Sequence, residues 1–134
     1  MSVVKNKRTI ASTQFLTNLQ KLQKEVLTWC KQQGNKNAPY GLTTLFTMAD
    51  RAFIFAWQAN KTYLKDEDSL LERKELFNKS IKHIHSFNAE LTGLMFCYNI
   101  SNEKLKRWSG YAYQAINQME SIKESDRKRI KKKK

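Results

Sequence analysis

Apolar residues recur along this chain at intervals of three and four, which is the spacing of one face of an α-helix. The first such run begins near Ser12, and Gly34 and Pro39 mark its end. Its apolar positions are Phe15, Leu19, Leu22, Val26, Trp29 and Cys30. The pattern predicts one amphipathic helix there, followed by a polar loop.

The second predicted helix, from about Tyr40 to Lys65, is apolar around much of its circumference. Three apolar residues, Met48, Ile54 and Phe55, fall outside its main stripe. A helix that is apolar on several sides is buried on more than one side. We therefore predict that these three residues form an oligomer interface, and the alternative is a central helix within one bundle. Its main stripe contains Leu42, Leu45, Phe46, Ala49, Ala52, Phe53, Ala56 and Trp57.

Two further helices complete the pattern. Ser69 with Glu72 matches a capping box that would begin the third helix, and Ser101 is the expected N-cap of the fourth. The fourth has the clearest stripe, and we expect it to fray after about Glu124. Its apolar positions are Leu105, Trp108, Ala112, Ala115, Met119 and Ile122. The aromatic residues expected in the core are Phe15, Trp29, Phe46, Phe53, Trp57, Phe77 and Trp108.

Four long amphipathic helices joined by short loops favour antiparallel packing. We predict an all-α fold: an antiparallel up-down-up-down four-helix bundle with basic terminal arms. The bundle would span residues 12–125, with a flexible basic arm at 1–11 and a flexible basic tail at 126–134.

Charge changes the picture, because the net charge of +13 is concentrated towards the two ends of the chain. Residues 1–40 hold seven Lys and Arg residues against one acid, Glu25, and residues 100–134 hold eleven against four. Residues 41–99 are balanced, with seven of each sign. Such an asymmetry indicates a polyanionic partner, and nucleic acid is the commonest one.

The predicted nucleic-acid contacts are the cations of the two basic segments. In the first helix, Lys21, Lys24 and Lys31 lie within about 80° of one another, opposite the apolar stripe. The tail would bind phosphates without reading bases. The whole predicted set is Lys5, Lys7, Arg8, Lys21, Lys24, Lys31, Lys36, Lys106, Arg107, Arg127, Lys128, Arg129, Lys131, Lys132, Lys133 and Lys134.

Catalytic constellations are hard to find in this sequence. His83 and His85 are two residues apart, so on a helix they point about 200° away from each other and cannot share a metal. Cys30 and Cys97 have no metal-binding spacing and are expected to be free thiols. We expect a non-enzyme with no metal and no cofactor. No apolar run approaches a membrane span and no signal peptide is seen, so we expect a cytoplasmic protein without a membrane partner.

Three local elements suggest a family. They are Tyr40-Gly41-Leu42-Thr43 at the start of the second helix, Ala89-Glu90-Leu91 in the third, and the turn Asn99-Ile100-Ser101 before a fourth helix that ends in Lys and Arg. With the four-helix layout, they resemble the family of the accessory variability determinant (Avd) of diversity-generating retroelements and the ribosomal-RNA intervening-sequence proteins. The resemblance covers about residues 12–125. It implies an antiparallel bundle, a pentameric ring with a basic surface, and binding to a reverse transcriptase and its template RNA.

These observations lead to one hypothesis with two rivals. The leading one is a non-catalytic accessory subunit that binds nucleic acid, RNA in preference to DNA, and partners a reverse transcriptase in a diversity-generating retroelement. The first rival is a scaffold that binds only protein, with the tail as a solubility or targeting element. The second is a DNA-binding accessory protein of a mobile element.

Overall fold

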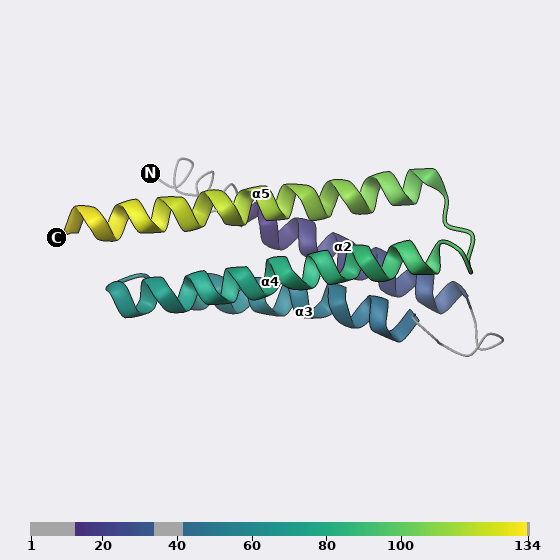
Figure 1. The fold of residues 1–134 in the computed structure, drawn as a ribbon, viewed down its shortest axis with the longest axis horizontal. Helices are drawn as coiled ribbons and strands as arrows, with labels where there is room; N and C mark the ends of the chain where they lie inside the picture. Colours follow the sequence, from purple (N-terminus) through teal and green to yellow (C-terminus); the bar gives the residue numbers. More distant parts are fainter. Residues whose placement is uncertain (1–12, 34–41, 134) are drawn as a thin grey trace, which may run out of the picture.

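Four long helices account for nearly all of the part of the chain that the structure describes. The structure is a computed structural model and describes residues 13–33 and 42–133. The helices are α2 (Gln14–Gln32), α3 (Leu42–Lys61), α4 (Glu67–Leu94) and α5 (Asn102–Lys133). Successive helices run in opposite directions, and α2 packs against α3, α3 against α4, α4 against α5, and α5 back against α2 (Figure 1). The predicted all-α antiparallel bundle is confirmed.

Side-chain caps fix where α4 and α5 begin. The α4 cap is a capping box, but its members are Asp66 and Ser69 and not the predicted Ser69 and Glu72. The Ser69 backbone N–H donates to Asp66 Oδ1 at 2.8 Å, and the Asp66 N–H donates to Ser69 Oγ at 3.0 Å. The predicted cap of α5 is confirmed, because Ser101 Oγ accepts from the Lys104 N–H at 3.1 Å. Both caps satisfy backbone donors that a helix start leaves unpaired.

The core consists of two apolar clusters stacked along the bundle. In the first, Phe15 of α2 meets Phe77 of α4 edge-on, with ring centroids 5.7 Å apart. In the second, Trp108 of α5 is fully buried between Trp29 and Phe87, with centroids 6.0 and 6.3 Å away. Edge-to-face geometry of this kind stabilises beyond the area that it buries. The inner face of α3 contributes mainly small residues, which let it approach its neighbours closely: Ala49, Ala52, Ala56 and Ala59.

One predicted core aromatic is not in the core. Trp57 is 46% exposed, so the prediction that it packs inside the bundle is wrong. The alanines occupy the centre of the inward face of α3 and leave Trp57 at its edge, where Lys61 Nζ lies 5.2 Å from its ring centroid. Ile54, one turn earlier, is 39% exposed.

The C-terminal segment departs most from expectation. The predicted flexible tail at residues 126–134 is wrong over 126–133, because α5 continues without a break to Lys133. Asp126 is 3% exposed and Ile130 is 5% exposed, and their spacing of four places them on the same side of the helix. Two buried positions one turn apart therefore hold this basic segment in helical form. The C-terminal end of a helix also favours cations, because the macrodipole is negative there.

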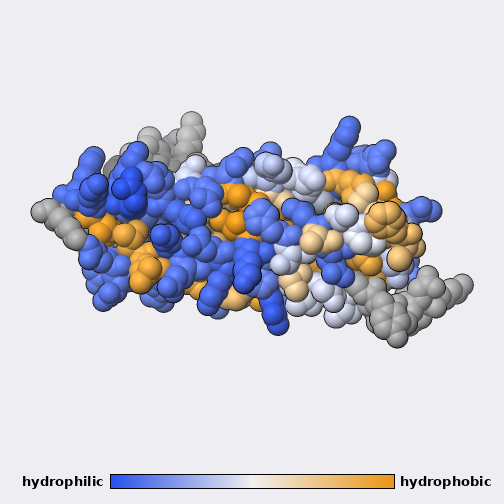
Figure 2. All heavy atoms as spheres, viewed as in Figure 1, coloured by the Kyte–Doolittle hydropathy of each residue, from blue (hydrophilic) through white to orange (hydrophobic). Residues whose placement is uncertain are grey.

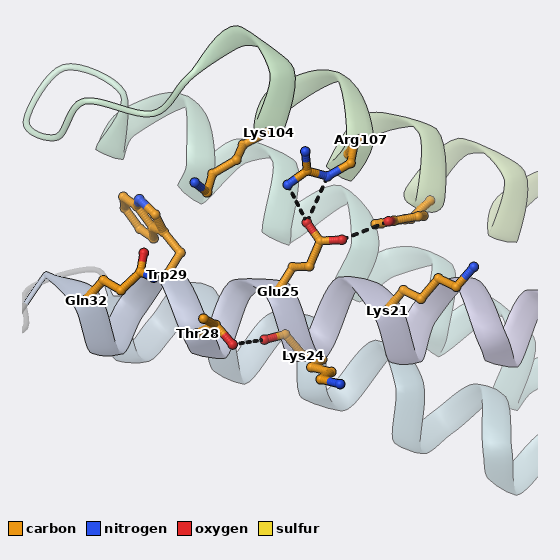
Figure 3. A pocket seen from close by; sticks show the side chains of 9 residues that line it. Lys21, Lys24, Glu25, Thr28, Trp29, Gln32, Lys104 and Arg107 are labelled. Atoms are coloured by element: carbon orange, nitrogen blue, oxygen red, sulfur yellow. Dashed lines mark hydrogen bonds and ion pairs between the residues drawn. The ribbon is translucent and has the colours of Figure 1, made fainter.

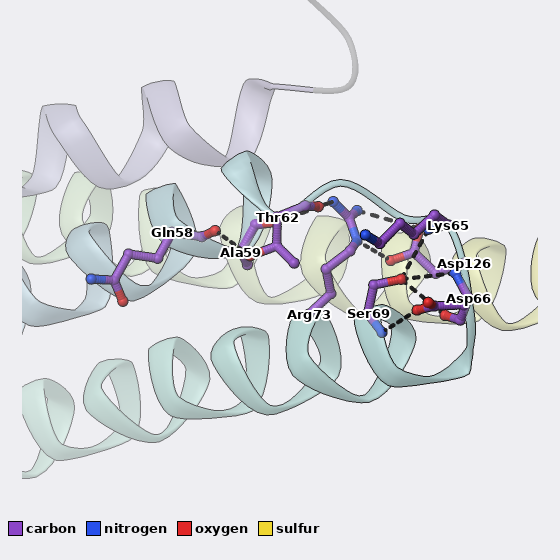
Figure 4. A network of polar contacts seen from close by, with 8 residues as sticks. All are labelled: Gln58, Ala59, Thr62, Lys65, Asp66, Ser69, Arg73 and Asp126. Carbon is purple, nitrogen blue, oxygen red and sulfur yellow. Dashed lines mark hydrogen bonds and ion pairs between the residues drawn. The ribbon is translucent and has the colours of Figure 1, made fainter.

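Asp126 is the anchor of this segment, and its partner is Arg73 of α4 (Figure 4). Arg73 Nε donates to Asp126 Oδ2 at 2.8 Å, and Nη2 donates to Oδ1 at 3.3 Å. The third nitrogen, Nη1, donates to the carbonyls of Ala59 and Thr62, at 3.1 and 2.9 Å, where α3 ends. One guanidinium thus joins α4 to α5 and also binds two carbonyls at the C-terminal end of α3.

Replacing Asp126 by Ala should destabilise the bundle. The substitution leaves the Arg73 side chain, which is only 12% exposed, without its charged partner, and breaking a buried ion pair in this way typically costs about 3–5 kcal/mol. We expect a fall of that order in the free energy of unfolding, measured by urea denaturation followed by circular dichroism. Helicity should also fall, because the last turns of α5 lose their anchor.

The exposed pair Arg127–Glu124 provides the matched control, since it joins two residues of the same segment within one helix. Glu124→Ala should leave the unfolding midpoint unchanged, because exposed ion pairs contribute little. Equal destabilisation by the two substitutions would contradict an anchoring role for Asp126.

Candidate nucleic-acid interface

A groove between α2 and α5 gathers several of the predicted cations (Figure 3). It encloses a cavity of about 500 Å³ that is open to solvent. Six residues of α2 and three residues of α5 line it. The lining residues are Lys21, Lys24, Glu25, Thr28, Trp29, Gln32, Lys104, Arg107 and Tyr111.

Glu25 lies at the centre of the groove and receives hydrogen bonds from three side chains of α5. Its Oε1 accepts from Arg107 Nη2 at 2.9 Å, Arg107 Nε at 3.1 Å and Trp108 Nε1 at 3.2 Å. Its Oε2 accepts from the Tyr111 hydroxyl at 2.7 Å. The one acid of the first forty residues therefore makes a network of polar contacts between α2 and α5.

The same contacts decide how these groups titrate. Burial raises the pKa of Glu25, but hydrogen bonds from Tyr111, Arg107 and Trp108 outweigh it and hold the pKa below its ordinary value of 4.5. The hydrogen bond to Glu25 raises the pKa of Arg107 and also raises that of Tyr111. The cluster thus stays ionised as a carboxylate and a guanidinium at neutral pH, and Arg107 is largely neutralised by its partners Glu25 and Glu103.

Two lysines flank this neutralised pair. Lys21 of α2 and Lys104 of α5 extend towards the groove from opposite helices, one on each side of Arg107, whereas Lys24 points away from α5 (Figure 3). Neither Lys21 nor Lys104 forms an ion pair with any residue that the structure describes. The groove therefore offers two ammonium groups to an anion in solution.

A second cationic surface covers the last turns of α5. These residues surround an open hollow of about 530 Å³: Ser125, Arg127, Lys128, Arg129, Lys131 and Lys132. Arg127 pairs with Glu124 at 2.6 Å, but the other four cations form no ion pair within residues 13–33 and 42–133. Figure 2 shows strongly hydrophilic atoms gathered at the end of the molecule where α5 ends. We call Lys128, Arg129, Lys131 and Lys132 the α5 terminal patch.

The remaining predicted contacts lie apart from these two surfaces or outside the described residues. Lys31 and Lys106 are exposed but line neither hollow. Of Lys133 only the helical backbone is described. The predicted contacts Lys5, Lys7, Arg8, Lys36 and Lys134, like the predicted arm at 1–11, lie outside the described residues.

Sequence reasoning missed Lys104, although one signal could have found it. It precedes Arg107 by three residues, so the two share a side of α5. Arg107 was predicted to bind phosphate, and the structure instead gives it Glu25 and Glu103 as partners. Glu25 was noted only as an isolated acid, and nothing local indicates that it meets a helix more than 80 residues later in the chain.

The three residues of the predicted oligomer interface have different surroundings. Met48 packs against the second core cluster, and Phe55 stacks on His83 of α4 with ring centroids 5.2 Å apart. Contacts within the chain thus account for two of the apolar residues outside the main stripe of α3. Ile54 remains exposed beside Trp57, and an interface there stays a prediction.

The structure adds little that would support catalysis or metal binding. His83 Nδ1 lies 2.7 Å from the Lys79 carbonyl of its own helix. Among the described residues, no three or more His, Cys, Asp or Glu side chains come together in a way that could hold a metal ion. Burial raises the pKa of the Cys30 thiol to about 11, which makes it a poor nucleophile at neutral pH. None of the described helices has both the length and the apolar composition that a bilayer crossing requires.

Comparisons of the chain with protein families, curated proteins and solved structures find no match. The geometry of the two cationic surfaces is therefore the basis for the functional argument.

Glu25→Gln should weaken the contact between α2 and α5. At neutral pH the loss of charge-assisted hydrogen bonds from Arg107, Trp108 and Tyr111 should cost about 2 kcal/mol of unfolding free energy. Because folding lowers the pKa of Glu25, this contribution is fully present above its ordinary value of 4.5 and is lost as the pH falls through the folded value. Urea denaturation of both proteins between pH 7 and pH 3 should show the difference shrinking only at the acid end.

Glu103→Gln is the control, because Glu103 also contacts Arg107 but its side chain is 84% exposed. We expect no measurable change in stability from it. A Glu25→Gln difference that persists undiminished to pH 3 would contradict the role of the carboxylate charge.

Proposed function

We propose that this chain is a non-catalytic nucleic-acid-binding subunit that holds the phosphate backbone through the α5 terminal patch and the groove between α2 and α5. The observation that carries the proposal is the patch itself. Four exposed cations within about one and a half turns of one helix have no ion pair within the described residues. A helix surface that only contacts solvent usually mixes both signs of charge, whereas phosphate neutralisation by Lys and Arg releases counterions and favours binding.

The rigid helical form of the patch strengthens this argument. Asp126 and Ile130 are buried within the same turns. The cations therefore lie on a helix that is anchored to the bundle and not on a disordered basic segment. Fixed cations lose less conformational freedom on binding than cations of a flexible chain, which favours affinity. Neither cationic surface presents an exposed aromatic ring, so the contacts suit phosphates and would not read bases.

The resemblance to the Avd family supports the finer part of the proposal. On that basis the nucleic acid is RNA in preference to DNA, and the partner is a reverse transcriptase of a diversity-generating retroelement, with Ile54 and Trp57 on the exposed side of α3 available for a protein contact. A reverse-transcriptase gene beside a template repeat in the genome would support this role. Co-expression followed by size-exclusion chromatography would test the complex directly.

Nucleic-acid binding should depend on the patch and on salt. For the variant K128Q/R129Q/K131Q/K132Q, we expect affinity for RNA in filter binding to fall on the order of 10- to 100-fold at low salt. The slope of log affinity against log salt concentration should fall by about 3, since each of the four lost phosphate contacts removes about 0.7–0.9.

The charge-matched control removes four cations from the balanced middle of the chain: R51Q/K65Q/K79Q/K82Q. This variant should keep most of the affinity and nearly the whole salt slope. Equal losses in the two variants would show a response to net charge alone and would contradict the patch. Absence of any binding at low salt would leave the protein-only scaffold as the function.

A further inference from the structure

The two cationic surfaces lie on the same long edge of α5. Hydrogen bonds place three residues on the α2 side: Arg107 and Tyr111 contact Glu25, and Gln114 accepts from Asn18 at 3.3 Å. At about 100° per residue, Ser125, Lys128 and Lys132 fall within about 40° of Gln114 around the helix axis. We call this line, from Lys104 to Lys132, the α2-side edge of α5.

Cations lie at the two ends of this edge, and neutral polar residues lie between them. At one end, Lys104 and the facing Lys21 form no ion pair with a described residue, and between them Arg107 is paired with Glu25 and Glu103. At the other end stand Lys128, Arg129 and Lys132. Between them the edge carries neutral polar residues: Gln114, Gln118, Ser121 and Ser125.

The acids in this part of α5 lie on its other side. Glu120 and Glu124 pair with Lys123 and Arg127 and line a hollow against α4. From Arg107 to Lys132, therefore, the α2-side edge presents cations at both ends and no carboxylate between them among the described residues.

The separation of the two ends matches a repeat of double-helical nucleic acid. Arg107, at the centre of the first end, is 21 residues from Lys128 and 25 from Lys132, which at 1.5 Å per residue is about 32 and 38 Å along the axis. One turn of a B-form DNA duplex is about 34–36 Å, whereas an RNA duplex is A-form and has different groove dimensions. A duplex lying along α5 would thus present phosphates to both cationic ends, with its groove over the neutral middle.

We propose that the ligand of this surface is a double-stranded segment at least one helical turn long, held at two points along α5. The inference rests on the proposed function and adds the form and length of the nucleic acid. Single strands are bound largely by stacking on aromatic rings, and this edge offers none: Tyr111 donates its hydroxyl to Glu25, and the exposed Tyr113 lies about 100° from Gln114, away from the edge.

The first test is the dependence of affinity on duplex length. DNA duplexes of 8, 12 and 16 base pairs, about 27, 41 and 54 Å long in B form, are titrated by fluorescence anisotropy. A-form RNA duplexes with the same numbers of base pairs and single strands of the same lengths are titrated beside them. We expect at least a tenfold gain in affinity between 8 and 12 base pairs. This is well above the statistical gain that a longer duplex gives by offering more positions at which the protein can bind. From 12 to 16 base pairs the gain should be small.

The second test separates the two ends with charge-matched pairs of substitutions. K21Q/K104Q and R129Q/K132Q should each weaken binding of the 16-base-pair duplex at least tenfold, lower its salt slope by about 2, and abolish the gain between 8 and 12 base pairs. R51Q/K82Q, outside the edge, should leave that gain in place. Circular dichroism melting checks that every variant is folded.

Other outcomes would overturn the inference. A smooth rise of affinity with length, tighter binding of single strands than of duplexes, or loss of affinity from only one pair of substitutions would each contradict two-point binding of a duplex, while nucleic-acid binding itself would stand. No binding of any duplex or single strand at low salt would overturn both the inference and the proposed function.

Discussion

The Arg73–Asp126 ion pair is the interaction on which the C-terminal part of this molecule depends. Residues 127–132 contain five cations, and like charges at helical spacing destabilise an isolated helix. Burial of Asp126 against Arg73 and burial of Ile130 one turn later offset that repulsion. Because the same guanidinium also binds two carbonyls where α3 ends, the anchor of α5 is shared by three helices. A segment whose composition resembles a disordered polycation is thereby part of the fold.

Much of the fold could be predicted from the sequence because the information is local. Apolar spacing of three and four identifies all four helices, and Ser101 marks the start of the last one. The predicted capping box of α4 begins three residues too late, because Asp66 and Ser69 are both favourable N-cap residues. Only the path of the chain selects Asp66. The helical C-terminal segment could not be predicted in this way. Its anchor pairs residues 53 positions apart, and a single Asp and a single Ile within a basic run carry no visible period.

The candidate site could be predicted only in part, for a related reason. Each helix shows which of its faces is polar, and this identifies Lys21, Lys24 and the C-terminal cations. It does not show which helices are neighbours, so the convergence of Lys21 with Lys104 follows only from the packing of α2 against α5. The burial of side chains along α3 could not be predicted from its sequence for the same reason. Trp57 lies on the apolar stripe and is exposed, whereas Phe55 lies off the stripe and stacks on His83.

The cations of this protein fall into two groups with different chemistry. Arg73 and Arg107 each hold a carboxylate through two or more guanidinium nitrogens and join helices that are distant in the sequence. A planar fork of donors suits that task, whereas a lysine is a compact point charge on a flexible stem. The cations on or facing the α2-side edge that form no ion pair with a described residue are mainly lysines: Lys21, Lys104, Lys128 and Lys132. Structural pairing therefore occupies Arg73 and Arg107. The remaining cations can neutralise phosphates without disturbing the contacts that hold the bundle together.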